Sequence, residues 1–128
     1  MRSKSYCIKV KPIAWQRAAR NSNRYFDAQA KDKLAHGLYL INQHGDEPLF
    51  EGPIRLQVIF FMAIPKTLQN RQHSVYHSKS PDLDNLIKFL LDAMTDVIIA
   101  DDRIICSLDA IKVYDVMPRT EFIITEVK

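Results

Sequence analysis

The chain has 128 residues, of which 47 % are hydrophobic and three are glycine, and its formal net charge at pH 7 is +3. This length predicts one domain over residues 1–128 with a substantial core, and the composition excludes a disordered chain or a glycine-rich fibre. The sequence has neither a secretory leader pattern nor the apolar run of about 18 residues that a membrane span needs. We therefore expect a cytoplasmic protein.

The first 45 residues predict a strand, a polar loop and a helix. A short apolar segment, Tyr6–Val10, is typical of a strand, and residues 15–25 are predicted as a loop. Asp27 is placed to cap the helix that follows, and this helix is expected to end before Gly45. Its apolar residues recur at i, i+4 and i+7, which predicts a buried stripe made of Leu34, Leu38 and Ile41.

The remaining residues predict a long strand, a second helix and two closing strands. Residues 53–64 alternate with period two, and because their second face also becomes apolar we expect a strand covered on both sides. The second helix begins between Pro81 and Leu83 and runs to about Val97. Two further strands are expected at residues 104–114 and 121–127. The order β-α-β-α-β-β indicates a small α/β (α+β) fold with a mixed sheet of about four strands and two main helices.

The second predicted helix is apolar over more than one face, which indicates broad burial. One stripe consists of Leu86, Leu90, Ala93 and Val97, and the stripe beside it consists of Ile87, Leu91, Met94 and Ile98. One stripe can cover the sheet, so the other needs a second partner. The sequence leaves two partners open, namely the first helix or the same helix of a second subunit.

Basic residues are concentrated in two segments that lack acids. No Asp or Glu precedes Asp27, whereas Arg2, Lys4, Lys9, Lys11, Arg17, Arg20 and Arg24 all do. Acids are absent again between Glu51 and Asp82, where the basic residues are Arg55, Lys66, Arg71 and Lys79. Two such segments can bind phosphates, although a solvated loop explains the second of them equally well.

Acidic residues gather between these basic segments and the C-terminus, as Asp82-Leu83-Asp84-Asn85 and Asp101-Asp102. Hydrolysis of a phosphodiester builds negative charge around an anion, and divalent metal ions offset that charge. Magnesium prefers hard oxygen ligands, and two ions about 4 Å apart can serve both the attacking and the leaving oxygen. The two acidic pairs, with Lys88 between them, therefore indicate metal-dependent hydrolysis of a nucleic-acid backbone.

Each of these residues also has an ordinary structural explanation. Asp82 can cap a helix, and Asp84 in the first turn can favour the helix dipole. Lys88 can pair with Asp84 at i+4, which stabilises a helix by roughly 0.3–0.5 kcal/mol. Asp101-Asp102 can be turn residues. Only their joint spacing favours the metal site.

The same residues resemble the RusA-type crossover-junction endodeoxyribonucleases of bacteria and their phages. The resemblance rests on Pro81-Asp82-Leu83-Asp84-Asn85-Leu86, Lys88, Asp92-Ala93, Asp101-Asp102 and Lys112. Near the N-terminus, the segment Lys11-Pro12-Ile13-Ala14-Trp15-Gln16-Arg17, followed by Arg20 and Tyr25-Phe26, is similar to a basic loop of that family. The resemblance extends over nearly the whole chain.

This resemblance implies a homodimeric, magnesium-dependent nuclease that resolves four-way (Holliday) DNA junctions by paired symmetric nicks, in DNA recombination and repair. The implied metal ligands are Asp82, Asp84 and Asp102, with Asp101 beside the third, and the implied essential lysine is Lys88. The implied DNA-binding residues are Lys11, Arg17, Arg20, Lys79 and Lys112. Ile104 departs from the polar Gln expected at its position, which bears on sequence preference.

These assignments give a mechanistic hypothesis in which three acids hold magnesium, water attacks the scissile phosphorus and Lys88 stabilises the developing charge. Asp92 is expected to orient Lys88. Two alternatives remain open, namely a non-catalytic DNA-binding module whose acids only cap a helix, and a nuclease that acts on another branched DNA. Cleavage of different DNA shapes with and without magnesium separates the three.

Overall fold

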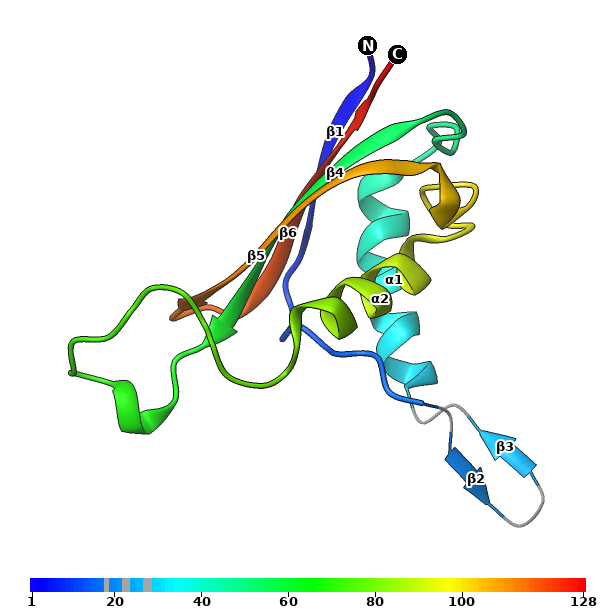
Figure 1. Cartoon of the computed structure of the whole chain (residues 1–128). Helices are drawn as coiled ribbons and strands as arrows, with labels where there is room; N and C mark the ends of the chain where they lie inside the picture. Colours follow the sequence, from blue (N-terminus) through cyan, green and yellow to red (C-terminus); the bar gives the residue numbers. More distant parts are fainter. Residues whose placement is uncertain (18, 22–23, 27–28) are drawn as a thin grey trace.

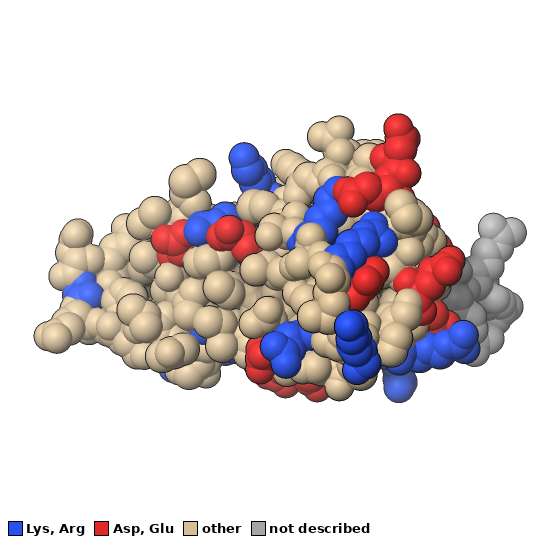
Figure 2. Space-filling model, turned by 90° about the horizontal axis from the view of Figure 1, so that it is seen from above, with Lys and Arg blue, Asp and Glu red and all other residues tan. Residues whose placement is uncertain are grey.

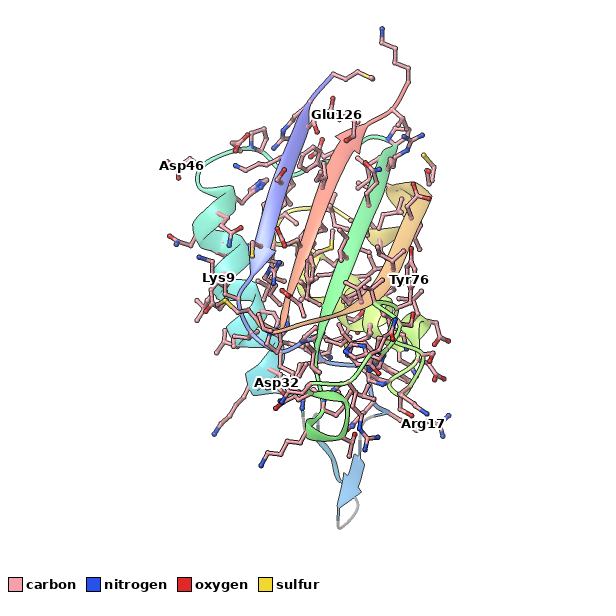
Figure 3. The ribbon with its side chains drawn as sticks, turned by 90° about the vertical axis from the view of Figure 1, so that its left-hand side faces the viewer. Lys9, Arg17, Asp32, Asp46, Tyr76 and Glu126 are labelled. Carbon is pink, nitrogen blue, oxygen red and sulfur yellow. The ribbon has the colours of Figure 1, made fainter. Side chains whose placement is uncertain are left out.

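The computed structural model describes residues 1–17, 19–21, 24–26 and 29–128. Its centre is a four-stranded mixed sheet in the order β1-β6-β4-β5, shown in Figures 1 and 3. The strands are β1 (Ser3–Ile8), β4 (Ile54–Ala63), β5 (Ile105–Asp115) and β6 (Arg119–Glu126). β6 is antiparallel to both β1 and β4, whereas β4 and β5 are parallel. β5 therefore forms one edge of the sheet.

Two helices, α1 (Ala30–His44) and α2 (Leu83–Met94), lie on the same side of the sheet (Figure 1). The core fills the space between the helices and the inner face of the sheet, with fully buried Phe60 and Phe122 from the strands and Leu40, Leu86 and Leu90 from the helices. The expected α/β fold with about four strands and two main helices in the order β-α-β-α-β-β is confirmed.

The long strand β4 alternates as expected, but only one of its faces is covered. Its inward residues, from Ile54 to Met62, are buried, while Arg55 and Gln57 on the other face are exposed. Ile59 and Phe61 are half-buried, and the Arg119 guanidinium lies 3.7 Å from the centroid of the Phe61 ring. The prediction of a strand covered on both sides is wrong, because no helix of the described chain packs on this face.

The predicted buried stripe of the first helix is also wrong. Leu34, Leu38 and Ile41 are 65 %, 57 % and 54 % exposed, whereas His36, Gly37, Leu40 and His44 face the core. These buried histidines have partners, since Tyr6 Oη lies 2.7 Å from His44 Nδ1 and the His36 ring meets Phe89 edge-on. Burial raises the pKa of Tyr6 to about 12.

In α2 the first predicted stripe is buried, and the second is buried in part. Leu86, Leu90 and Ala93 are buried, as is Met94 of the second stripe, while Ile87 and Leu91 are half-buried. α1 packs against α2, so intramolecular packing accounts for part of the second stripe. The helix ends at Met94 rather than Val97, and a turn follows.

The remaining elements are short. The predicted polar loop of residues 15–25 contains two small strands, β2 (Ala19–Asn21) and β3 (Arg24–Phe26), which pair with each other. Asp27, the predicted cap of the first helix, lies outside the described residues. Two 3₁₀ turns, η1 (Lys66–Leu68) and η2 (Asp102–Ile104), follow β4 and precede β5. Within the described residues, the helices are too short or too polar to cross a bilayer.

Candidate functional site

The start of α2 carries two exposed carboxylates. Asp82 occupies the N-cap position with extended backbone angles, yet its side chain accepts no capping hydrogen bond. Aspartate is among the best capping residues, so an Asp at this position that leaves the helix N–H groups unused is unusual. Asp84 lies in the first turn, and its Oδ1 accepts a hydrogen bond of 2.9 Å from the backbone N–H of Asn85. Both carboxylates thus remain accessible to a ligand.

Lys88 lies one turn further along α2 and is exposed. Its ammonium lies 3.9 Å from the centroid of the Trp15 ring, and the backbone N–H of Trp15 donates a hydrogen bond of 2.8 Å to the carbonyl of Asn85. The described structure shows no ion pair of Lys88 with Asp84. The expectation that Asp92 orients Lys88 is wrong, because the Asp92 carboxylate lies 4.0 Å from the ammonium of Lys33 on α1.

Lys112 of β5 holds the loop that leads into α2. Its ammonium donates hydrogen bonds of 2.7 Å and 2.8 Å to the carbonyls of Lys79 and Pro81. The backbone N–H of His77 donates to the Lys112 carbonyl, and that of Tyr114 donates to the carbonyl of Val75. Figure 3 shows Tyr76 beside β5, in agreement with its bridge to Val113. Lys112 therefore fixes the position of Asp82, a role that sequence spacing did not indicate.

His77 lies in this loop and packs against Tyr114, with ring centroids 4.9 Å apart. Burial and the nearby Lys112 ammonium lower the pKa of His77. Its Nδ1 is buried without a hydrogen-bond partner in the described chain. A neutral ring is therefore favoured there, which agrees with the sequence-based rejection of zinc.

The second acidic pair lies where β5 begins. Asp101 caps η2 by accepting a hydrogen bond of 3.0 Å from the backbone N–H of Arg103. That bond, together with the Arg103 charge and the neighbouring Asp102 carboxyl, holds the pKa of Asp101 below its usual range. Asp102 is exposed.

The two acidic pairs lie at opposite ends of α2 within one chain. The helix has 12 residues and is therefore about 18 Å long. Asp82 is next to Pro81 and Lys112, whereas Asp102 precedes Ile105, about 23 Å back along β5 at roughly 3.3 Å per residue. One chain thus does not bring Asp102 to Asp82 and Asp84. Consistently, the described residues contain no cluster of three acidic, His or Cys side chains suited to a metal ion.

The predicted DNA-binding lysines and arginines differ in how free they are. Lys11, Arg17 and Lys79 are exposed, while Lys112 is half-buried and bonded to the loop carbonyls. The backbone of Arg20 belongs to β2, and its side chain is outside the described part of the chain. Arg17 points away from the sheet, at the end opposite the one where Asp46 and Glu126 lie (Figure 3).

Charges of both signs are interspersed on the face near the two termini (Figure 2). Ion pairs such as Arg2 with Glu47 contribute to this mixture. A surface of alternating sign does not attract a phosphate backbone as a uniformly basic surface does. This face is therefore a poor candidate for nucleic-acid binding, in contrast to the exposed basic residues near the start of α2.

Comparison with known proteins gives two kinds of match. A family described as "Endodeoxyribonuclease RusA" matches residues 9–125. A Bacillus subtilis (strain 168) protein named "Uncharacterized protein YqaN" is 28 % identical over 138 aligned residues, which cover 94 % of this chain and 97 % of that protein. The "Crossover junction endodeoxyribonuclease rusA" of Lactococcus phage r1t is 43 % identical over 76 residues, which cover 59 % of this chain and 56 % of the phage protein.

Proposed function

The chain belongs to the RusA family of endodeoxyribonucleases, and we propose that it resolves four-way DNA junctions by paired symmetric nicks that require magnesium. The name of the phage relative supports this substrate class. A four-way junction has two equivalent strands to cut, so a twofold-symmetric homodimer with two equal sites matches its substrate. Such nicking serves DNA recombination and repair.

The observation that carries the proposal is the arrangement at the start of α2. Two accessible carboxylates, Asp82 and Asp84, stand one turn from the ammonium of Lys88, and neither is used to cap the helix. Trp15 ties the basic N-terminal segment to this point through Asn85, and Lys112 ties the loop that contains Lys79. Exposed cations thus flank a carboxylate pair, as cleavage of an anionic strand requires.

Magnesium fits the donors of this site, because carboxylate oxygens are the hard ligands that it prefers and one or two of them commonly suffice together with water and phosphate oxygens. Bound there, it would supply Lewis-acid stabilisation and a more acidic water. The chain itself contributes Lys88, which stabilises negative charge on the phosphate, and the cations Lys11, Arg17 and Lys79, which bind the flanking backbone. Neighbouring carboxylates repel each other, so magnesium should also raise the stability of the protein.

The separation of the two acidic pairs gives the homodimer a second purpose. Asp101 and Asp102 lie too far from Asp82 to act on the same phosphate within one chain. In a twofold dimer, the pair from one protomer can instead complete the carboxylate pair of its partner. The catalytic set Asp82, Asp84, Lys88 and Asp102 would then be assembled from two chains, with Asp101 holding the turn that presents Asp102.

The proposal is tested by incubating the protein with junction, flap, duplex and single-stranded DNA of the same sequence, with and without magnesium. We expect symmetric nicks in the junction only when magnesium is present. Cleavage of flaps in preference to junctions would assign another branched substrate. Absence of cleavage from all four DNAs with magnesium would contradict the nuclease assignment.

Asp82→Asn separates cleavage from binding, because it removes a charge without shortening the side chain. We expect this variant to lose cleavage by at least 100-fold and to bind the junction as tightly as the unmodified protein or more tightly, since a negative charge near the phosphate is gone. It should also lose the stabilisation by magnesium. Asp46→Asn, an exposed Asp just after α1, is the matched control and should leave all three properties unchanged.

One observation favours the alternative of a DNA-binding module, namely that a single described chain gathers no three-acid cluster. Such a module would bind junctions with a strong dependence on salt and no dependence on magnesium. A binding curve that is unchanged by magnesium, in a protein that cuts none of the four DNAs, would support it.

A further inference from the structure

The free edge of β5 is the feature of the fold that most clearly lacks a partner. β5 pairs with β4 on one side only. On the other side, the segment around Tyr76 covers its C-terminal part through bonds to Lys112 and Tyr114. From Ser107 to Ile111, no other strand of the described chain lies on this side. An uncovered edge presents N–H and C=O groups that pair readily with another strand.

The direction of these groups follows from strand alternation. Lys112 and Tyr114 direct their backbone groups to the free edge, because they bond to the segment around Tyr76. Residues two apart point the same way, so Leu108 and Ala110 also direct their N–H and C=O groups to the free edge. The Leu108 side chain is 45 % exposed in the middle of a strand, and Ile111 is 42 % exposed. Backbone groups and apolar surface therefore coincide on this edge.

We infer that two copies of the chain pair antiparallel along β5, with the twofold axis at Leu108, and that this pairing completes the site. The inference rests on the proposed function, because it concerns the same acids. A twofold axis at Leu108 sets each residue opposite the one equally far on the other side. Asp102 of one protomer then comes opposite Tyr114 of the other, next to the Lys112 that holds the loop before Asp82.

Charge selects this register over its neighbour. With the axis at Leu108, each Asp109 faces Ser107 of the second copy, and Leu108 faces its own equivalent. With the axis one residue later, the two Asp109 carboxylates would face each other directly, which destabilises a strand pair. Adjacent strands are about 4.8 Å apart, so the pairing brings each Asp101-Asp102 turn to the opposite end of the other copy's α2.

The register is tested by cross-linking. Equivalent residues in a hydrogen-bonded antiparallel pair have Cα atoms about 5.5 Å apart, which suits a disulfide. With Cys7 and Cys106 both replaced by Ser, Leu108→Cys should form a disulfide-linked dimer in high yield on mild oxidation. Leu34→Cys in the same background, on the exposed stripe of α1, should not. Efficient linkage through Leu34→Cys with none through Leu108→Cys would overturn the inference and assign the α1 stripe as the interface.

A second variant asks the opposite question without relying on cysteine chemistry. Leu108→Lys places two like charges across the axis while leaving the exposed position free to solvate the new charge in a single chain. We expect the mass in sedimentation equilibrium to fall from dimer to monomer, and junction nicking to fall at least 10-fold. Leu34→Lys should change neither. A Leu108→Lys protein that stays dimeric would overturn the β5 interface, whereas unmodified protein that never nicks DNA would overturn only the proposed function.

Discussion

The ammonium of Lys88 lies 3.9 Å from the centre of the Trp15 ring, which joins the basic N-terminal segment to the acidic helix α2. The ring also shields one side of the lysine from solvent, so the ammonium is held at a fixed point next to the Asp82–Asp84 pair. A flexible lysine would lose side-chain entropy each time it engaged a phosphate.

Replacement of Trp15 by Leu should therefore slow cleavage without abolishing it. A cation–π contact at an exposed site contributes about 0.5–1 kcal/mol, which corresponds to a roughly two- to five-fold lower rate. Lys88→Met should lower the rate by about 100-fold or more, because it removes the charge itself. Single-turnover cleavage rates measure both, with Lys31→Met on α1 as the control. Equal losses in Trp15→Leu and Lys88→Met would contradict a positioning role for Trp15.

Mixing two inactive variants should restore activity if the acids come from different chains. Asp82→Asn and Asp102→Asn homodimers each lack one acid in both sites. A mixed dimer has one site with both acids replaced and one with both intact, so it should nick one strand of each junction. Nicked rather than fully resolved junctions on a gel are the expected product. If the mixture stays as inactive as its components, then the acids do not combine across chains.

Lys112 and Lys79 should respond differently to replacement, although both were predicted to bind DNA. Lys112→Met removes two charge-assisted hydrogen bonds to the loop and should lower the free energy of unfolding by about 2–4 kcal/mol. Lys79→Met should leave stability unchanged, because that side chain is exposed, and should reduce the salt dependence of junction binding by about one counterion. Urea unfolding and binding titrations over salt concentration measure these effects. Equal stability of the two variants would refute the structural role of Lys112.

Stability should decrease as the pH falls below neutrality. Burial lowers the pKa values of both His36 and His44 in the folded chain. The unfolded chain therefore binds protons below about pH 6.5 that the folded chain does not, which favours unfolding. Urea unfolding at pH 8, 7, 6 and 5 should show a constant free energy down to about pH 7 and a decline below it. His36→Asn, which removes one of these groups, should make the decline shallower.

The sequence was sufficient for the order of elements and for the family. Alternation in β4 and the apolar residues of α2 are local patterns, and each places its own inward face. The identities of Asp82, Asp84, Lys88 and Asp102 needed no coordinates either, because a motif records which chemical groups are present.

The sequence was misleading where a stripe had two possible destinations. Leu34, Leu38 and Ile41 have helical spacing, but α1 turns its His36, Leu40 and His44 side to the core because Tyr6 and Phe89 offer partners there. Periodicity reports that a face is apolar and does not report what covers it. The same limit applies to β4, whose second apolar face carries no helix.

Only the tertiary structure decided how far apart the motif residues lie. Asp84 and Asp102 are separated by a rigid helix, and a helix fixes the distance between its ends at about 1.5 Å per residue. Residue identity therefore determined the chemistry that this protein can perform, whereas the path of α2 and the free edge of β5 determined that one chain holds only half of each site.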